Sequence, residues 1–519
     1  MSREYDAIVI GSGLGGLTAG ALYARAGHRV LLLERNHSFG GAASVYQHGH
    51  LTIEASLHET TDPHNPHDPK YQIFQALDIL DDIEFVPIDN FFEVRGAALG
   101  KPFVLPHGIE QIQAALLERF PHQVDGIRKF FHKLKSVSQA MSMLNEKHSG
   151  LWWFLHAPSL PLSLWPLLKD MKKNLSEVFQ DLFGDDETIK LALAANLGYY
   201  ADDPDKLWWL FYATAQGGFM TGGGYYIRGG SQALSDCLVK VIIEENGCAE
   251  AGHQVTRILL DDNGQIRGVE HQDADGQDTQ TDYAPVIFGN AAPHLLAQML
   301  PEPQGTDFFK PYEDKPLSLS LFSVSLGVNK HPAEFGVSSY STILVPEWMT
   351  SLQDIKHNAN LLSEAPGQRM PSMGMVDYSR INTGLNSKPP YLVSLVGLDQ
   401  TSNWAHLSKD AYHQKRDQWL DALINTVDKA YPGIAKAIVQ KEMATALTMR
   451  DYLNTPNGAL YGFAPQPPTS WNMAHFRSPK TPIDNLWLAS SFAGAGGFTG
   501  AMMGGATAAR MALHALRSE

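Results

Sequence analysis

Three glycines near the start of the chain have the spacing of a dinucleotide-binding loop. Residues 11–16 have the sequence Gly-Ser-Gly-Leu-Gly-Gly, which fits GxGxxG at Gly11, Gly13 and Gly16. The first glycine permits a tight turn, the second lets the backbone approach a pyrophosphate, and the third allows close packing of a helix on a strand. Glu34 follows at roughly 20 residues, where an acidic side chain accepts hydrogen bonds from a ribose. The pattern predicts binding of an ADP-containing dinucleotide.

The elements around this loop agree with that function. An apolar run at residues 5–10 predicts a buried parallel strand that leads directly into the glycines. Residues 17–26 predict a helix closed by Gly27, and residues 29–33 predict a second strand that ends on Glu34. The free N–H groups and the positive end of such a helix would face the pyrophosphate.

A second glycine doublet helps to distinguish a flavin-binding protein from a nicotinamide-binding one. Gly40 and Gly41 follow shortly after Glu34 and can pass close to the diphosphate and the ribityl chain of FAD. Proteins of the glutathione-reductase and amine-oxidase type commonly have this doublet, whereas NAD-dependent folds do not need it. By resemblance the doublet favours FAD.

Another glycine-rich junction lies near the far end of the chain. Residues 485–489 predict a buried strand, and a glycine-rich stretch over 490–500 connects it to a small-residue helix that ends at about 516. The N–H groups and the dipole of this helix can face the N1–C2 carbonyl edge of a flavin and stabilise the anionic reduced ring. Tight packing of the helix through its small residues is compatible with that role.

Two side chains are candidates for contact with the reacting groups. His58 follows the second glycine doublet, so residues 54–58 could line a flavin, and a structural histidine is the alternative. If a proton moves, His58 or Tyr461 could move it. A metal site at His58, His64 and His67 is conceivable because carboxylates lie nearby, but three interspersed prolines predict an extended surface loop. We predict no metal site.

Composition and charge exclude several functions. The chain has 519 residues, of which 44% are hydrophobic and 18% charged, as in a globular protein of two or three domains. A net charge of −15 argues against nucleic acid as a partner. The two cysteines, Cys237 and Cys248, are too few for a disulfide framework and lack zinc-ligand spacing. The sequence predicts neither a signal peptide nor a membrane span, so a cytoplasmic location is expected.

The chain as a whole resembles the FAD-dependent carotenoid desaturase, carotenoid isomerase and retinol saturase group, the phytoene dehydrogenase-like relatives of the amine oxidases. Residues 226–230 (Tyr-Ile-Arg-Gly-Gly) look like the Y-x-x-G-G of this group, and 290–293 (Asn-Ala-Ala-Pro) like its N-A-x-P. Residues 457–462 look like the G-x-x-Y-G segment of the isomerase and saturase branch. Residues 253–255 with 268–269 are similar to a hairpin whose valine backbone usually meets the adenine.

The resemblance and the glycine motifs together define the expected cofactor site. The residues predicted to contact FAD are Gly11, Gly13, Leu14, Gly16, Glu34, Arg35, Gly40, Gly41, Ala42, Val255, Asn290, Ser491, Gly497, Phe498 and Thr499. Two positions depart from the related proteins. Ala42 stands where amine oxidases usually have an arginine, and Ser490-Ser491 stands where a G-D or G-Q pair is common.

The predicted fold is α/β, with a discontinuous Rossmann-type FAD-binding domain of the glutathione-reductase or amine-oxidase kind. We assign residues 1–90, 217–295 and 480–519 to this domain, and residues 91–216 and 296–479 to an α+β substrate domain. Aromatic residues and prolines over 150–212 predict a helical cap with part of its inner wall lining a tunnel. A lid that touches a membrane is the alternative left open.

The resemblance implies an oxidoreductase in which a flavin exchanges hydride with a carbon–carbon bond of a long apolar polyene or isoprenoid, by desaturation, saturation or flavin-assisted cis/trans isomerisation. An amine or amino-acid oxidase is the first alternative, for which Arg228 or Arg450 could hold a carboxylate. A non-enzymatic prenyl-binding protein of the dissociation-inhibitor type is the second. The expected partner is a hydrophobic small molecule, and the sequence leaves the oligomeric state open.

Overall fold

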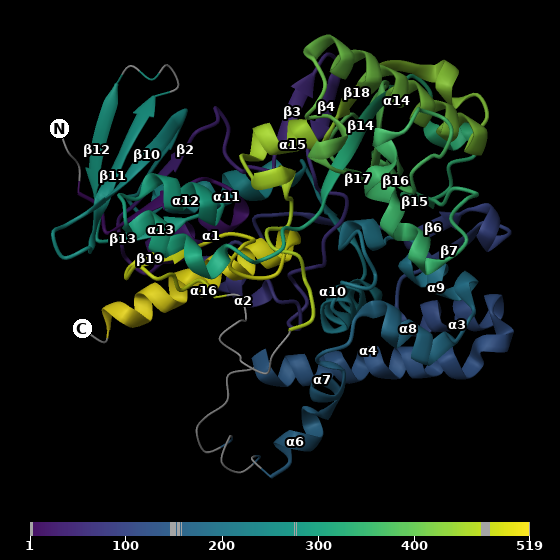
Figure 1. Cartoon of the computed structure of the whole chain (residues 1–519), viewed down its shortest axis with the longest axis horizontal. Coiled ribbons are helices and arrows are strands. Elements are labelled where there is room, and N and C mark those ends of the chain that lie inside the picture. Colours follow the sequence, from purple (N-terminus) through teal and green to yellow (C-terminus); the bar gives the residue numbers. More distant parts are fainter. Residues whose placement is uncertain are drawn as a thin grey trace.

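The computed structural model describes residues 4–145, 152, 156, 158–273, 276, 278–468 and 478–517. Two lobes lie side by side, and both ends of the chain belong to the same lobe (Figure 1). That lobe contains a parallel sheet, while the other contains a larger mixed sheet with a group of helices beside it. None of the described helices is both long and apolar enough to cross a membrane.

A five-stranded parallel sheet forms the centre of the first lobe. Its strand order is β19-β13-β1-β2-β9, and every neighbouring pair is parallel. Both faces are covered, so the central strands are almost entirely apolar. The strands are β1 (Ala7–Ile10), β2 (Val30–Glu34), β9 (Cys248–Ala251), β13 (Val286–Gly289) and β19 (Leu486–Leu488).

Three helices cover one face of this sheet: α1 (Leu14–Arg25), α11 (Ser231–Glu244) and α16 (Gly497–Leu516). The sequence places the start of the first helix at residue 17, and this boundary is wrong because the helix begins at Leu14, within the glycine motif. The sequence also misses β9, whose residues Cys-Ala-Glu-Ala lack the apolar pattern of a buried strand.

A three-stranded antiparallel sheet packs against the other face. Its strands are β10 (His253–Leu260), β11 (Ile266–Asp273) and β12 (Thr279–Tyr283). Apolar residues of β10 and β11, such as Val255 and Val269, meet Leu31 and Leu33 of β2 in one buried cluster. The helices α12 (Pro293–Met299) and α13 (Gln304–Phe309) complete this side.

The second lobe is built on a seven-stranded sheet in the order β18-β14-β17-β16-β15-β6-β7. All its pairs are antiparallel except β15 with β6. One face packs against α14 (Lys409–Ala430). The strands are β18 (Ile438–Ala444), β14 (Ser320–Val328), β17 (Tyr391–Asp399), β16 (Met373–Asp377), β15 (Ser341–Leu344), β6 (Asn90–Arg95) and β7 (Phe103–Pro106).

Helices that follow β7 form a further apolar cluster beside this sheet (Figure 1). They are α3 (Ile109–Arg119), α4 (Val124–Asn145), α7 (Trp165–Asp170), α8 (Leu175–Phe183), α9 (Glu187–Ala194) and α10 (Trp209–Gly222). The short helix α6 (Leu160–Ser163) precedes α7 and has no buried residue. The predicted cap at 150–212 lies partly outside the described residues. Because α10 continues past residue 216, the boundary predicted there would cut a helix, and the division into domains stays a prediction.

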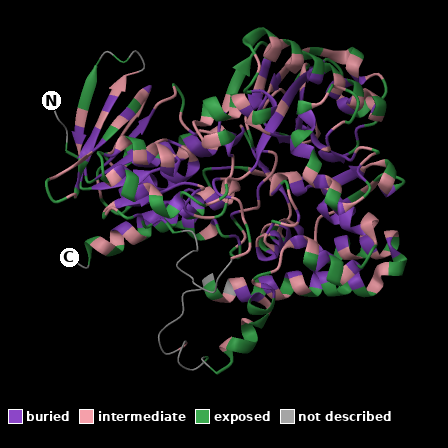
Figure 2. Ribbon diagram, viewed as in Figure 1, coloured by how far each residue is buried: buried purple, intermediate pink, exposed green. Residues whose placement is uncertain are grey.

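Short elements connect the two lobes. The hairpin of β3 (Val45–His48) and β4 (Leu51–Glu54) is followed by α2 (Tyr71–Leu77). The strand β5 (Phe85–Pro87) pairs with β8 (Tyr225–Ile227), and α15 (Ala446–Leu453) follows β18. Buried residues fill the interior of both lobes, whereas most residues of α6 and several of α7 are exposed (Figure 2).

Helices α1 and α16 cross with their backbones in contact, which joins the two ends of the chain. A Cβ atom at Gly505 would lie 2.0 Å from the carbonyl oxygen of Gly15. A Cβ atom at Gly15 would lie 2.4 Å from the carbonyl oxygen of Ala489, just after β19. Since the obstructing atoms are backbone, no side-chain rotation can relieve either overlap.

We therefore expect Gly505→Ala to lower the free energy of unfolding by about 1–3 kcal/mol, because the added methyl group overpacks this crossing. Denaturant unfolding monitored by circular dichroism measures the change. The matched control is Gly218→Ala in α10, where an added Cβ atom has no neighbour within 4 Å. This control should stabilise the chain slightly, since alanine is the better helix former. Equal stability of Gly505→Ala and the unaltered chain would contradict the close approach.

Candidate active site

The loop between β1 and α1 has the geometry that its glycines predict. Gly11 has a φ of +93°, a backbone conformation that favours glycine. A Cβ atom at Gly16 would lie 2.3 Å from the carbonyl oxygen of Gly11, so the helix packs closely against the turn. The Asn290 side chain accepts a hydrogen bond from the Gly16 N–H at 3.1 Å, which ties β13 to the first turn of α1. Asn290 is thus next to the predicted pyrophosphate site.

Glu34 is turned back toward this loop. Its Oε2 atom accepts hydrogen bonds from the Ser12 N–H at 2.8 Å and from Ser12 Oγ at 2.7 Å. Its Oε1 atom accepts one from the Asn36 N–H at 2.8 Å. The carboxylate is buried, so these bonds fix its orientation at the end of β2. A carboxylate held in this way can still accept further bonds, because each oxygen has two lone pairs.

The second glycine doublet lies directly against the first loop. Gly40 has a φ of +115° and its N–H donates to Ser12 Oγ at 3.0 Å. Gly41 has a φ of +58°, and a Cβ atom there would lie 3.3 Å from Gly13 Cα. The backbones of the two glycine segments therefore lie against each other, as the sequence predicts for a cofactor that contacts both.

Three further residues predicted to bind the cofactor make other contacts. Arg35 donates to the carbonyl oxygens of Asp451 at 2.8 Å and Tyr452 at 2.6 Å, so its guanidinium anchors the end of α15. The carbonyl oxygen of Ala42 accepts from Ser56 Oγ at 2.7 Å. Val255 is buried in β10, where it faces β2. Contact between these residues and a cofactor stays a prediction.

The start of α16 is the second predicted half of the site. Gly497 has a φ of +79°, and the helix begins there without a side-chain cap. Gly496 approaches Tyr461 so closely that a Cβ atom on it would lie 2.3 Å from Tyr461 Cβ. Ser491, whose carbonyl oxygen packs on Gly462, and Phe498 lie in the same junction. The helix N-terminus and Tyr461 thus lie together.

A buried lysine beside this junction was missed in the sequence. Lys70 is fully buried, pairs with Asp68 at 2.9 Å, and donates to Thr61 Oγ1 at 2.6 Å and to Thr499 Oγ1 at 3.3 Å. Burial lowers its pKa, an effect that the Asp68 carboxylate opposes. The Lys70 amine therefore lies at the first turn of α16. No local signal distinguishes Lys70, because its partner in α16 is more than 400 positions away.

Glu54 holds the segment that carries His58. Its Oε1 atom accepts from Ser231 Oγ at 2.6 Å and from the Leu57 N–H at 3.0 Å, and its Oε2 atom from the Ser231 N–H at 2.8 Å and Tyr226 Oη at 3.2 Å. A carboxylate at the start of α11 is favourable because it meets the positive end of the helix. The Y-x-x-G-G motif and the His58 segment are therefore locked together.

His58 is paired with a tyrosine from another part of the chain. Its Nδ1 atom lies 2.9 Å from Tyr199 Oη, and its carbonyl oxygen accepts from Tyr340 Oη at 2.7 Å. Burial lowers the pKa of His58 to about 4, so the imidazole is neutral at pH 7. Burial raises the pKa of Tyr461 to about 12, which keeps its phenol protonated. Both predicted catalytic side chains are thus neutral hydrogen-bonding groups.

Glu59, which the sequence did not single out, is the acidic group of this region. Its Oε2 atom is shielded from solvent and has no hydrogen-bond partner among the residues that the structure describes. A Cβ atom at Gly224 would lie 2.5 Å from it and 3.3 Å from His107 Cε1, so the two side chains flank this glycine. Burial raises the pKa of Glu59 to about 8. The carboxyl is therefore protonated at neutral pH and can donate a proton.

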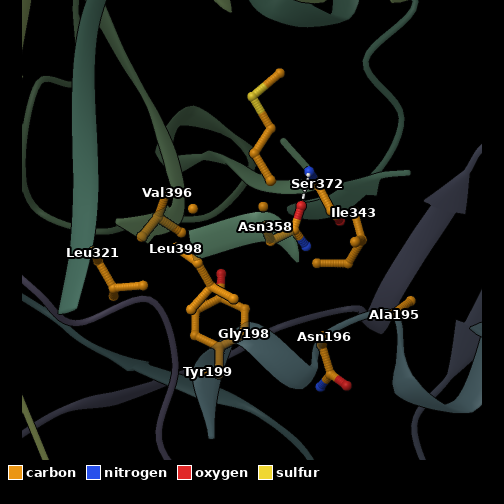
Figure 3. Close-up of a pocket in the computed structure, with 13 residues that line it drawn as sticks. Ala195, Asn196, Gly198, Tyr199, Leu321, Ile343, Asn358, Ser372, Val396 and Leu398 are labelled. Carbon is orange, nitrogen blue, oxygen red and sulfur yellow. Dashed lines mark hydrogen bonds between the residues drawn. The ribbon is translucent and has the colours of Figure 1, made fainter. Parts of the chain in front are cut away.

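An apolar pocket opens beside the His58–Tyr199 pair. Tyr199 lines it together with Leu321, Val396 and Leu398 from β14 and β17 (Figure 3). Asn358 and Ser372, at the opposite side, are joined by a hydrogen bond of 3.0 Å. Tyr199 and Tyr461 both pack against the apolar cluster that contains these three side chains. The apolar cluster on one side of the pocket thus extends to Tyr461, which lies against Gly496 at the start of α16.

If Glu34 holds the ribose, Glu34→Ala should weaken dinucleotide retention and also release Ser12 from its buried acceptor. The ratio of bound flavin or nicotinamide cofactor to protein after gel filtration measures this. Glu245→Gln, which removes an exposed partner of Arg25, is the control and should leave the ratio unchanged. Unaltered occupancy in Glu34→Ala would contradict the ribose role.

Comparisons with known proteins agree with this geometry. Residues 9–77 match the model of the NAD(P)-binding Rossmann-like domain. The chain is 23% identical to an all-trans-retinol 13,14-reductase of Danio rerio, over 99% of this chain and 86% of that protein. It is 25% identical to a chloroplastic prolycopene isomerase of Daucus carota, over 99% of this chain and 81% of that protein.

Its structure resembles that of the cyclohexylamine oxidase from Brevibacterium oxydans IH-35A, with a TM-score of 0.61, 16% identity and 99% of each chain covered. This likeness confirms the predicted Rossmann-type, amine-oxidase-like fold. The similarity to the retinol reductase and the prolycopene isomerase runs through the whole chain and confirms the resemblance to the carotenoid isomerase and retinol saturase group.

Proposed function

We propose that the protein is an FAD-dependent oxidoreductase that acts on carbon–carbon double bonds of a long apolar polyene or isoprenoid. The observation that carries this proposal is the meeting of the α16 N-terminus, the neutral His58–Tyr199 pair and an apolar wall at one place. The full-length similarity to proteins named as a reductase of all-trans-retinol and an isomerase of prolycopene supports the same substrate class.

The residues at the two glycine junctions fit FAD. Gly13 and Gly41 lie close together, and a Cβ atom at Gly41 would be 3.3 Å from Gly13 Cα, so bare backbone lines the place where a diphosphate would bind. In this proposal Gly11, Gly13, Gly16 and Glu34 hold the ADP half, and residues 497–499 face the flavin. When bound, FAD would supply or accept the hydride that changes the bond order of the substrate.

The protein's own part is to hold a polyene and to exclude water. Leu321, Val396 and Leu398 offer a wall without charges, which suits a planar hydrocarbon chain. Tyr461 lies between this wall and the start of α16, where it can contact both substrate and ring. His58, neutral and hydrogen-bonded to Tyr199, can orient a polar end of the substrate without introducing a charge.

Glu59 is the group that we propose as proton donor. Saturation of a double bond adds one hydride and one proton to its two carbons, and isomerisation by protonation adds and then removes one proton. A carboxyl that stays protonated at neutral pH suits both reactions, because general acids work best with a pKa near the operating pH. Near pH 7 the neutral His58 imidazole is a weak base and the Tyr461 phenol holds its proton tightly, so in this proposal both act as contacts.

The contacts of two arginines argue against the first alternative, an amine or amino-acid oxidase, in which Arg228 or Arg450 would hold a substrate carboxylate. Arg228 pairs with Glu84 at 2.9 Å at the surface, and Arg450 pairs with the neighbouring Asp451 at 2.7 Å. Neither is among the residues around the pocket. The second alternative, a non-enzymatic prenyl-binding protein, predicts that the purified chain holds no flavin.

We retain peripheral membrane contact as part of the proposal, because a polyene enters most readily from a lipid phase. Leu162, Trp165 and Leu168 on α6 and α7 are 80%, 59% and 37% exposed. Apolar side chains grouped on one surface are typical of proteins that touch a membrane or a partner.

The reaction itself is tested by anaerobic incubation of the flavin-loaded protein with retinoids and carotenoids, followed by mass spectrometry. A mass change of two hydrogens indicates saturation or desaturation, and an unchanged mass with altered retention indicates isomerisation. A colourless protein that FAD does not rescue, or peroxide formation from amines without turnover of polyenes, would overturn the proposal.

We expect Glu59→Gln to slow turnover by about 10²–10⁴-fold while flavin content stays the same, because the amide cannot donate the proton. The rate of the unaltered protein should fall as the pH rises through about 8, since the donor is the protonated form. This decline should be absent from the residual activity of Glu59→Gln. Glu110→Gln, which changes a carboxylate that is 73% exposed, is the control for both measurements. A normal rate in Glu59→Gln would assign the proton to another group.

A further inference from the structure

Residues that suit a metal ion meet where the parallel sheet adjoins the three-stranded sheet. Glu250 lies in β9, His253 begins β10, and His271 lies in β11. One ring nitrogen of each histidine and one carboxylate oxygen of Glu250 lie within 4.8 Å of one another. His271 is fully buried, and the other two residues are partly buried. The cluster is thus enclosed on one side by both sheets.

The strand register explains why these side chains meet. His271 pairs with Val255 across β10 and β11, so His253 is its diagonal neighbour on the same face of the sheet. Asp282 of β12 is the diagonal neighbour on the other side, because it pairs with Val269. Three consecutive strands therefore align His253, His271 and Asp282 in one row. Glu250 joins this row from the edge strand of the other sheet.

The second observation is the way in which His271 is oriented. Its Nε2 atom lies 3.0 Å from Asp282 Oδ2, and both side chains are buried. Because a carboxylate only accepts hydrogen bonds, we assign the proton to Nε2, which leaves a lone pair on Nδ1. This lone pair faces His253 Nδ1 at 3.1 Å. A buried carboxylate behind an imidazole is the arrangement that orients histidine ligands of zinc.

The distances are close to those that a zinc ion requires. With Zn–N bonds of about 2.0–2.1 Å, ligand atoms around a tetrahedral zinc lie roughly 3.3 Å apart. The two ring nitrogens at 3.1 Å already meet this requirement. The carboxylate needs only a small movement, because all three ligand atoms are within 4.8 Å of one another.

A thiol beside the cluster narrows the choice of metal. Cys248 precedes Glu250 by two positions on the same face of β9, and its Sγ atom lies 3.5 Å from Glu250 Oε1. Imidazole and thiolate suit zinc, whereas magnesium and calcium prefer oxygen ligands alone. We propose that His253, His271 and Glu250 bind one zinc ion, with Cys248 positioned to complete the coordination.

The ion would act as a structural clamp. It would join β9, the edge of the parallel sheet, to β10 and β11 of the antiparallel sheet. Glu34 is paired in register with Ala251, the residue after Glu250, so the clamp lies near the predicted ribose position. This inference does not depend on the proposed reaction, because a clamp would be present with any substrate.

The competing possibility is a chain of hydrogen bonds without metal. In that case His253 Nδ1 donates a hydrogen bond to His271 Nδ1, and Glu250 Oε2 lies 3.9 Å from His253 Nε2. The same side chains would then stabilise the sheets by hydrogen bonding alone, and zinc would have no effect.

The test is zinc stoichiometry of the flavin-loaded, full-length protein after zinc addition, a wash with a weak chelator and gel filtration. We expect one zinc per chain by elemental mass spectrometry. His253→Gln and Glu250→Gln should each weaken zinc binding by at least about 100-fold, by loss of one ligand. The control is His64→Gln, which alters a histidine that is 42% exposed and pairs with Asp62 at 2.7 Å. This variant should keep its zinc.

Asp282→Asn tests the orientation of His271 separately. It leaves every proposed ligand in place and should weaken zinc binding about 10- to 100-fold, as loss of a carboxylate behind a ligating histidine does. Cobalt substitution gives a spectroscopic check on the unaltered protein, since tetrahedral cobalt absorbs intensely at wavelengths longer than those of flavin.

Several results would overturn the proposal. One is a washed protein that retains no zinc, and another is equal retention by the unaltered protein and both ligand variants. A third is a melting temperature that each ligand variant lowers equally with and without zinc, which would assign the cluster to hydrogen bonding. If a variant fails to fold, the cobalt measurement on the unaltered protein still tests the proposal. Absence of a tetrahedral cobalt spectrum would overturn it. Flavin content and polyene turnover are measured separately, so failure here leaves the proposed function intact.

Discussion

The backbone contact between α1 and α16 is the constraint on which the rest of the structure depends. Gly505 meets the carbonyl oxygen of Gly15, and Gly15 meets that of Ala489, so both helix N-termini are held at the same edge of the parallel sheet. The carboxyl ends of parallel strands are where ligands bind in such folds. A long cofactor can therefore contact the first and the last helix at once only because small residues allow this approach.

The side chains around the pocket are buried and mostly uncharged, and binding of a polyene requires such surroundings. A charged group beside a hydrocarbon would lose its solvation without compensation. Burial keeps the His58 imidazole uncharged, and it keeps the Glu59 carboxyl protonated. The buried Lys70 amine does not lie unpaired, because Asp68 is 2.9 Å from it. The Lys70–Asp68 pair therefore lies at the start of α16, and the wall of Leu321, Val396 and Leu398 has no charged side chain.

The sequence predicts the parts of this arrangement that are local. The GxGxxG loop, Gly40-Gly41 and the strand ending on Glu34 each lie within a short stretch, so spacing and residue type suffice to recognise them. Glu59 and Lys70 could not be found in this way, because their properties come from burial and from partners distant in the chain. The edge strand β9 was missed for a related reason: its pairing with β2 rather than its composition makes it a strand. The sequence places the start of α1 too late because glycines 15 and 16 disfavour helix locally. Close packing requires both, since Gly15 meets the backbone of Ala489 after β19 and Gly16 meets the carbonyl oxygen of Gly11.

The cluster around His271, on the other face of the parallel sheet, is also formed by residues from separate parts of the chain. Glu250 and His253 are close in sequence, but His271 joins them only through the register of β10 and β11. A cysteine, a glutamate and two histidines at such spacings match no short metal motif, so the sequence predicts no metal there. Antiparallel pairing turns residues that are far apart along the chain into diagonal neighbours. Sheet register can therefore bring together a set of possible ligands that linear spacing conceals, just as the crossing of two helices brings together the two predicted halves of the cofactor site.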